Sequence, residues 1–248
     1  MSTTAASPVT LSKLVSRQEV AERTIAFRFE KPTNWTFKAG QCLDMTLLDP
    51  SETDAEGNTR TLSIASAPHE DTLMVATRMR DTAFKRVLNT IPPGSAVKIE
   101  GPSGSLTLYK NVKRTAVFLA GGIGITPFRS VVFRAAQERL PHRIFLFYSN
   151  RRPEDAPFLD ELQAMENENP DYRLIASMTE MAESHRSWHG EVGPIDKEML
   201  GRFLNLKDAV SPIYYVAGPP EMVKGIHTML NKADVDDDDI RAEEFAGY

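Results

Sequence analysis

The first part of the chain shows the short alternation of apolar and polar residues that is typical of half-buried β-strands. Proline, glycine and asparagine residues between these segments indicate turns. We expect strands at residues 24–29, 42–48, 73–79 and 96–100, and one short helix at residues 82–89. Several short strands in succession predict an antiparallel β-barrel or sandwich.

The second part alternates between nearly all-apolar strands and helices. We expect strands at residues 115–120, 143–148, 172–177, 213–217 and 240–245, and helices at residues 127–140, 158–167, 197–203 and 220–231. Apolar strands that alternate with helices are typical of a parallel sheet covered on both faces. The prediction is therefore an antiparallel β-barrel domain over residues 10–110, followed by an α/β domain with a doubly wound parallel sheet over residues 111–248.

Composition and charge narrow the class of protein. The 248 residues include 29 basic and 34 acidic side chains, a net charge of −5, which argues against nucleic acid as the main ligand. The single cysteine, Cys42, permits neither an intramolecular disulfide nor an iron–sulfur cluster on four thiolates. No signal peptide or membrane span is apparent, so we expect a cytoplasmic protein without a membrane partner, with a monomer as the default.

A glycine-rich turn follows the first apolar strand of the second part and opens a helix. It contains Gly121, Gly122, Gly124, Thr126 and Pro127. Such glycines let the backbone approach a diphosphate, and the amides at the helix start supply hydrogen-bond donors. We expect the threonine to cap the helix and the proline to occupy its first position. The motif alone also fits a structural turn that binds nothing.

Three further segments carry candidate chemistry. Arg60-Thr61-Leu62-Ser63 offers a guanidinium for a phosphate and a hydroxyl that we expect on the same strand face, although a surface arginine beside a buried serine explains these four residues alone better. A second glycine turn contains Gly218 and Pro219, and the chain ends on two glutamates and two aromatic residues.

In this order, the motifs resemble the ferredoxin–NADP reductase superfamily, in which a flavin-binding barrel precedes a nicotinamide-binding sheet domain. Residues 37–41 and 101–104 add to the resemblance, which covers residues 10–248. It implies an FAD-dependent reductase that passes electrons from NADH or NADPH through flavin to a separate carrier such as ferredoxin or flavodoxin. The alternatives are an oxygenase reductase component, a flavin-bearing electron-transfer subunit that never binds nicotinamide, and a flavin-free binding module.

The resemblance also assigns the flavin site. Arg60 would bind the flavin phosphates, Ser63 would bond near the flavin N5, and Leu62 replaces the aromatic residue that usually lies along the ring. Further cofactor-binding residues would be Thr61, Ala76, Thr77, Arg78, Thr82, Ala83, Phe84 and Lys85. For the lysine, a solvated position on a helix face is an equal alternative.

On the nucleotide side, the first glycine turn matches the diphosphate site, and Gly218 and Pro219 match the turn beside the nicotinamide. Ala217 replaces a cysteine that is frequent there. Glu243, rather than Glu244, matches a carboxylate near the active site. Phe245 would cover the flavin, with Tyr248 as the alternative cover.

The sequence leaves the choice between NADH and NADPH open. The run 177–180 contains no arginine and one carboxylate, which favours NADH. Arg151 and Arg152 are within reach of a phosphate, but ion pairs with Glu154 or Asp155 explain them better. His185 and His189 have a metal-ligand spacing, but their polar, glycine-containing surroundings indicate a loop without a third ligand.

Overall fold

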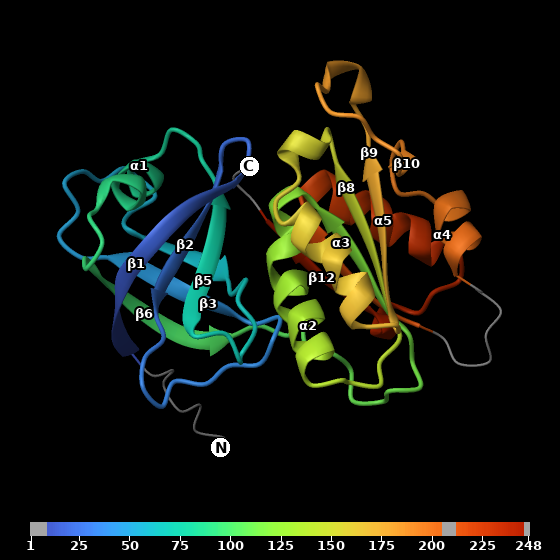
Figure 1. Cartoon of the computed structure of the whole chain (residues 1–248), viewed down its shortest axis with the longest axis horizontal. Coiled ribbons are helices and arrows are strands. Elements are labelled where there is room, and N and C mark those ends of the chain that lie inside the picture. Colours follow the sequence, from blue (N-terminus) through green and yellow to red (C-terminus); the bar gives the residue numbers. More distant parts are fainter. Residues whose placement is uncertain (1–8, 205–211, 246–248) are drawn as a thin grey trace.

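The computed structural model describes residues 9–204 and 212–245. Within them, a barrel-like sheet and a parallel sheet lie side by side (Figure 1). The first sheet is antiparallel and has the strand order β4-β3-β6-β1-β2-β5. Its strands are β1 (Val9–Ala21), β2 (Thr24–Glu30), β3 (Cys42–Leu47), β4 (Thr59–Ser63), β5 (Thr72–Arg78) and β6 (Ala96–Ser103), and helix α1 (Ala83–Thr90) follows β5. A bridge between Ile64 and Val75 joins the two outer strands, which curls the sheet into a barrel.

The second sheet is parallel throughout and has the order β10-β9-β8-β7-β11-β12. Its strands are β7 (Ala116–Gly121), β8 (Ile144–Asn150), β9 (Tyr172–Met178), β10 (Glu191–Val192), β11 (Ile213–Gly218) and β12 (Ile240–Glu244). Its helices are α2 (Thr126–Gln137), α3 (Leu159–Glu168), α4 (Lys197–Phe203) and α5 (Pro220–Asn231), with 3₁₀ turns η1 (Gly122–Ile125), η2 (Pro153–Asp155), η3 (Met181–Glu183) and η4 (Asp237–Asp239).

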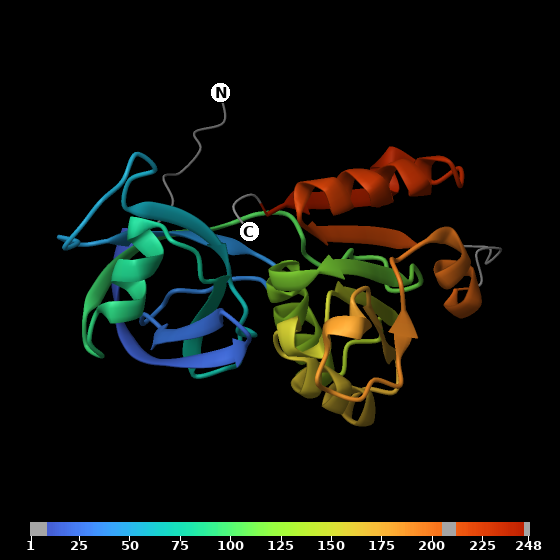
Figure 2. The same ribbon diagram turned by 90° about the horizontal axis from the view of Figure 1, so that it is seen from above.

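Helices cover both faces of the parallel sheet (Figure 2). Phe118 of β7 stacks on Phe128 of α2 with ring centroids 4.6 Å apart, so α2 covers one face. Val117 and Leu119 point the other way and pack with Val223 of α5. This alternation explains why the strand is apolar at every position.

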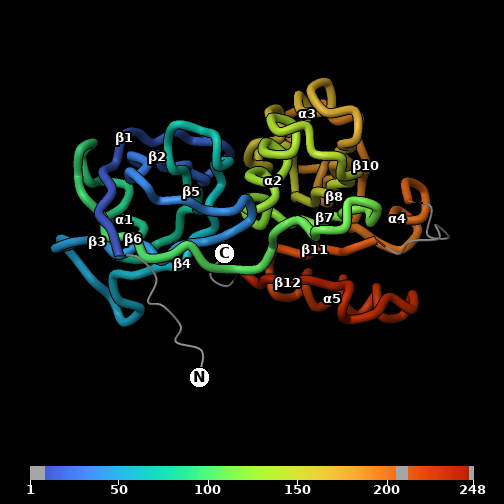
Figure 3. The backbone as a smooth tube through the Cα atoms, turned by 90° about the horizontal axis from the view of Figure 1, so that it is seen from below, coloured from blue at the N-terminus to red at the C-terminus, as the bar shows by residue number. Residues whose placement is uncertain are grey.

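The predicted fold class is confirmed, with most element ends within a few residues of those expected. Neither β1 nor the two-residue β10 was predicted, whereas the segment from Arg60 to Ser63 lies on a strand, β4, as expected. The predicted domain boundary near residue 110 stays a prediction. It falls between β6 and β7, where the chain crosses from one sheet to the other (Figure 3).

The two sheets share an apolar interface. Ala26 and Ala76 of the barrel belong to the same buried cluster as Phe128 and Val131 of α2. Gly40 has φ +94°, and an added Cβ would lie 2.1 Å from the Leu106 carbonyl oxygen. A glycine is therefore required where the barrel meets α2. No helix within residues 9–204 and 212–245 is long and apolar enough to span a membrane.

Candidate functional site

The glycine-rich turn lies at the carboxyl end of β7. A Cβ on Gly121 would lie 2.2 Å from the Met222 sulfur, and one on Gly124 would lie 2.3 Å from the Ala217 carbonyl oxygen. These two glycines therefore let the turn pack closely against the neighbouring strand and helix. Gly122 differs, because it has φ +52° and an added Cβ would meet no atom within 4 Å. Its backbone therefore faces open space, as a diphosphate site requires.

The prediction that Thr126 caps α2 is wrong. The cap position belongs to Ile125, which has helical dihedral angles, and no side chain caps the helix. The Thr126 hydroxyl donates to the Ile123 carbonyl at 3.0 Å. The reason is that η1 runs directly into α2, so the threonine already lies inside the helix. Pro127 lies in the first turn as the second residue of the helix, one position after the predicted one.

The second glycine turn meets the first one. A Cβ on Gly218 would lie 3.1 Å from the Gly121 nitrogen, and Pro219 leads into α5. The strands that carry the two turns, β7 and β11, are neighbours in the sheet, and β8 lies on the other side of β7. The strand order therefore reverses at these turns, which is where open α/β sheets bind ligands.

The carboxyl-terminal strand β12 brings two predicted residues to the carboxyl ends of β7 and β11, where the glycine turns lie. The Phe245 amide donates to the Gly218 carbonyl at 2.9 Å, and Glu243 is in register with Ala217. Tyr248 lies outside the described residues.

Glu243 also meets the barrel. A Cβ on Gly104 would lie 3.3 Å from the Cys42 sulfur and 3.7 Å from the Glu243 Oε1. Cys42 pairs with Ser63 across β3 and β4, so both side chains share a face with that carboxylate nearby. Burial raises the pKa of Glu243. Burial, and then the neighbouring Glu243, raise the pKa of the Cys42 thiol, although its hydrogen bond to Ser103 opposes this.

The structure thus places Glu243 beside Cys42, the residue that pairs with Ser63 across β3 and β4. In the sequence, this cysteine was used only to exclude an intramolecular disulfide and a four-thiolate cluster. Nothing in the sequence signals this cysteine, because its position beside Glu243 depends on the contact between the two sheets.

The prediction that Arg60 and Ser63 share a strand face is wrong. They are three residues apart, and side chains alternate along β4. Arg60 is in register with the buried Met45, whereas Ser63 is in register with Cys42. Leu62 is on the face of Arg60 and packs against the core of the barrel. Thr61 is on the face of Ser63, and its hydroxyl donates to Asp44.

Residues 51–58, here called the acidic loop, surround Arg60. The Arg60 Nη2 lies 2.7 Å from the Glu56 Oε2 and 3.9 Å from the Asp54 Oδ1. The Nη1 donates to the carbonyls of Glu56, Gly57 and Thr59. The guanidinium carbon lies 5.1 Å from the centre of the Phe84 ring.

The acidic loop also contacts the start of α1. The Ala83 amide donates to the Asp54 carboxylate at 2.8 Å, and Arg86 donates twice to Glu52 at 2.8 and 2.6 Å. Thr82 caps the helix and accepts from the Lys85 amide. The arginines and the helix-start amide already bind carboxylates, and the same donors suit a phosphate. The donor set therefore fits a flavin diphosphate that takes the place of these carboxylates.

Lys85 is buried, so the alternative of a solvated lysine is wrong. It is 9% exposed, and its ammonium donates to the Arg78 carbonyl at 2.7 Å. Burial lowers the pKa of Lys85 to about 8, and the nearby Arg80 and Arg60 add to this effect. A bound anion would counter both effects.

Ala76 and Arg78 line the contact between the sheets, whereas Thr77 lies on the opposite face of β5, in register with Ile25 of the barrel. Ala76 and Thr77 are buried. The Arg78 Nη2 lies 3.1 Å from the buried Asp155 of η2, which also pairs with Arg152 at 2.8 Å. Arg78 therefore joins the barrel to the parallel sheet.

Both arginines after β8 form ion pairs, and one of them, Arg152, pairs with a predicted partner. Arg152 contacts Asp155, and it also reaches Glu22 of the barrel at 2.7 Å. The predicted partner Glu154 instead accepts from the Ser184 hydroxyl at 2.9 Å. Arg151 is exposed and lies 3.7 Å from Glu180. Among residues 9–204 and 212–245, no group of three or more histidine, cysteine or acidic residues is placed to hold a metal ion.

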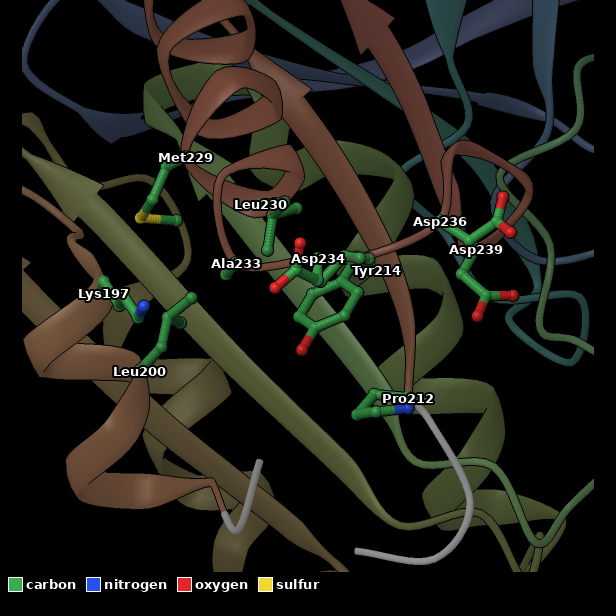
Figure 4. A pocket seen from close by; sticks show the side chains of 11 residues that line it. Lys197, Leu200, Pro212, Tyr214, Met229, Leu230, Ala233, Asp234, Asp236 and Asp239 are labelled. Carbon is green, nitrogen blue, oxygen red and sulfur yellow. The ribbon is translucent and has the colours of Figure 1, made fainter. Parts of the chain in front are cut away.

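A cavity of about 200 Å³ lies elsewhere, at the opposite end of β11 (Figure 4). It is lined by Tyr214, Leu230 and Asp239, among others. Because Tyr214 is near the start of β11 and Gly218 is at its end, this cavity is separate from the glycine turns.

Comparison with known proteins gives one family match. Residues 118–228 match the oxidoreductase NAD-binding domain. The chain is 27% identical over 212 residues to reductase component 2 of terephthalate 1,2-dioxygenase from Comamonas sp., covering 85% of this chain and 60% of that protein. It is 28% identical over 188 residues to one component of the Na⁺-translocating NADH-quinone reductase of Idiomarina loihiensis, covering 74% of this chain and 44% of that component. The chain thus spans about half the length of these relatives.

Solved structures show the same fold. A ferredoxin NADP⁺ reductase from Neisseria gonorrhoeae with bound FAD and NADP has a TM-score of 0.77 at 22% identity, covering 95% of this chain and 98% of that one. The FAD/NAD-binding domain of nitric oxide dioxygenase from Vibrio cholerae has a TM-score of 0.78 at 15% identity, with coverages of 95% and 98%. Residues 118–228 thus match the family of oxidoreductase NAD-binding domains, and the chain as a whole has the two-sheet fold of these solved structures.

Proposed function

We propose that this chain is an FAD-dependent oxidoreductase that passes electrons from NADH or NADPH through flavin to a separate electron carrier. One observation carries the proposal: the two glycine turns lie at the carboxyl ends of β7 and β11, beside Glu243, which lies near Cys42 of the barrel, the cross-strand partner of Ser63. A nucleotide bound at the turns would therefore reach the barrel at these side chains.

The residues of the chain would bind and orient the two cofactors. FAD, when bound, accepts a hydride and releases electrons singly. The open backbone at Gly122 would admit the nucleotide diphosphate. The Ser63 hydroxyl would offer a hydrogen bond near the hydride acceptor, and Phe245 would cover the ring. The raised pKa of Glu243 would let its carboxyl group hold a proton at a higher pH than an exposed one. Positioning, rather than a nucleophile, would supply the catalysis.

The cationic site at the start of α1 would hold the flavin diphosphate. Arg60, Arg86 and the Ala83 amide now bind carboxylates of the acidic loop, and the diphosphate would exchange with them. Lys85 of α1, whose ammonium donates to the Arg78 carbonyl, would add a positive charge. The substitution of Leu62 for an aromatic residue removes one stacking contact.

The carrier would be a ferredoxin, a flavodoxin or the oxygenase partner of a reductase component. The terephthalate relative favours the last of these, because it is a reductase component of a dioxygenase. The one cysteine of this sequence cannot hold a four-thiolate cluster, so the one-electron centre would belong to the carrier or to another domain. A cytoplasmic location and a monomeric state remain predictions.

Anaerobic titration of the purified protein with NADH and NADPH, followed by flavin absorbance, tests the proposal. Bleaching by either nucleotide supports it, and the two titration curves give the preference. A yellow protein that neither nucleotide bleaches would contradict it and favour an electron-transfer subunit. A colourless protein that FAD cannot reconstitute would show that the assigned flavin site is wrong.

A further inference from the structure

Asn150, the last residue of β8, has a buried side-chain amide that makes no hydrogen bond of normal geometry, although it lies close enough to Tyr148 to lower the pKa of that hydroxyl. It is 7% exposed, and neither its Oδ1 nor its Nδ2 has a hydrogen-bond partner among the described residues. Buried amides normally have partners, because an unpaired buried polar group destabilises the folded state. A protein keeps such a group where it has a use that folding alone does not require.

The position of Asn150 points to the first glycine turn. Ser149, the residue before it, is in register with Gly121 of β7. Asn150 lies on the same strand face as Tyr148, whose hydroxyl donates to the Gly122 carbonyl at 3.2 Å. Burial raises the pKa of Tyr148 well above its usual value, and the nearby Asn150 amide opposes part of this rise. The end of β8 that carries Asn150 therefore lies beside the turn that contains Gly122.

We infer that the Asn150 amide hydrogen-bonds the ribose and diphosphate of the ADP half of the nicotinamide nucleotide. The inference rests on the proposed function and adds a residue that none of the motifs contains. An amide has two donor hydrogens for phosphate oxygens and an acceptor oxygen for a ribose hydroxyl. It carries no charge, so it attracts the diphosphate without the repulsion that a carboxylate would cause. It also discriminates against neither NADH nor NADPH.

Two substitutions and one control test this role. Asn150→Ala removes the amide, and Asn150→Asp keeps its shape but adds a negative charge. Asn169→Ala is the control, because Asn169 is similarly buried, at 6% exposure, and also has an unpaired Nδ2. It lies just before β9, at the amino-terminal end of the parallel strands and therefore away from the glycine turns. Its Oδ1 accepts from the Asp171 amide at 3.0 Å.

The measurements are calorimetric titrations of the FAD-loaded proteins with NAD⁺ and with ADP, and Tm without nucleotide. N150A should weaken both ligands by about 5- to 100-fold, the effect of one or two lost hydrogen bonds, without lowering Tm. N150D should weaken them further. N169A should lower Tm, because it loses a made hydrogen bond, and should leave both affinities unchanged.

Two results would overturn the inference. If N150A lowers Tm as N169A does and binds NAD⁺ and ADP like the wild type, a buried water satisfies the amide and its role is structural. If N150A weakens NAD⁺ but not ADP, the contact is not with the ADP half of the nucleotide. A wild-type protein that binds neither ligand would instead contradict the proposed function, and the inference with it.

Discussion

Arg129 of α2, the helix that follows the first glycine turn, joins the parallel sheet to the barrel. It is 2% exposed. Its guanidinium donates to the Ala65 carbonyl at 2.9 Å, to Glu70 at 3.0 Å and to Glu161 at 2.7 Å. It also stacks on the Phe133 ring at 4.0 Å. The first two partners belong to the segment that continues from β4, so one side chain holds the glycine-turn helix against the chain that carries the predicted flavin residues.

Arg129→Met removes these bonds but keeps most of the apolar volume. The Ala65 carbonyl loses a buried donor, which costs about 1–3 kcal/mol. Glu70, whose side chain is 21% exposed, loses its ion-pair partner in a partly buried site. Glu161 is 42% exposed, so its contribution is at most about 1 kcal/mol. We therefore expect the free energy of unfolding to fall by about 3–5 kcal/mol, the range for breaking a buried pair.

Urea denaturation measures this loss, and a matched variant controls for it. Arg134→Met lies on the same helix, where Arg134 pairs with Glu138 at 3.0 Å in an exposed position, and should cost less than about 0.5 kcal/mol. Adding Glu70→Met to Arg129→Met should recover part of the stability, because it removes the uncompensated carboxylate. A loss below about 1 kcal/mol for Arg129→Met, or equal losses for both arginines, would refute this reasoning.

The same variant should slow flavin reduction more than it weakens nucleotide binding. Arg129 fixes the segment after Ser63 relative to the helix after the glycine turn, and neither site loses a ligand-binding group. Stopped-flow measurements should therefore show a lower rate at saturating nucleotide with little change in Kd. A change in Kd alone would show that the contact between the sheets does not set the hydride-transfer geometry.

Three further predictions concern charged groups at the proposed flavin site. Asp54→Asn combined with Glu56→Gln should raise the FAD affinity of the apoprotein by about 3- to 10-fold, because these carboxylates compete with phosphate for Arg60; lower affinity in a fluorescence titration would show that they shape the site instead. Because the pKa of Lys85 is about 8, FAD affinity should fall between about pH 7 and pH 9 in the wild type but not in Lys85→Met, and parallel pH profiles would contradict this role. Burial raises the pKa of Glu243, so the folded protein binds this proton more tightly than the unfolded chain and loses stability as the group ionises. Glu243→Gln should therefore gain stability relative to the wild type as the pH rises from about 4 to 7, with no difference below about pH 4, and a pH-independent difference in urea denaturation would count against this explanation.

The order and type of most elements followed from the sequence because each carries a local signal. Helix α4 begins and ends where predicted, since Asp196 caps it and accepts from the Met199 amide at 2.8 Å. β7 was recognisable because both of its faces are covered and every position is apolar. The sequence did not predict β1, because most of its 13 residues are not fully buried and it pairs with two different strands. Its length depends on those partners and not on its own pattern.

The site was predictable only where it depends on local backbone chemistry. The glycine turns were recognised because close packing and an open backbone both require glycine, as Gly121 and Gly122 show. The shared face of Arg60 and Ser63 was wrong, because residues three apart on a strand point to opposite faces. The cap at Thr126 was wrong, because it depends on the exact start of the helix. The contacts of Cys42 and Asn150 were not foreseen at all. They involve segments distant in sequence, which no local pattern encodes.

Ion pairs between the two sheets also join residues that are distant in sequence, and they bear on the proposed function. Arg129 with Glu70, Arg78 with Asp155, and Arg152 with Glu22 each join the barrel to the parallel sheet. Hydride transfer requires donor and acceptor atoms in a fixed near-contact geometry, and an error of about 1 Å can cost 100-fold in rate. Two domains joined only by a linker could not keep that geometry. The three ion pairs and the shared apolar cluster around Phe128 therefore belong to the catalytic apparatus of the proposed reductase, although none of them touches the reacting atoms.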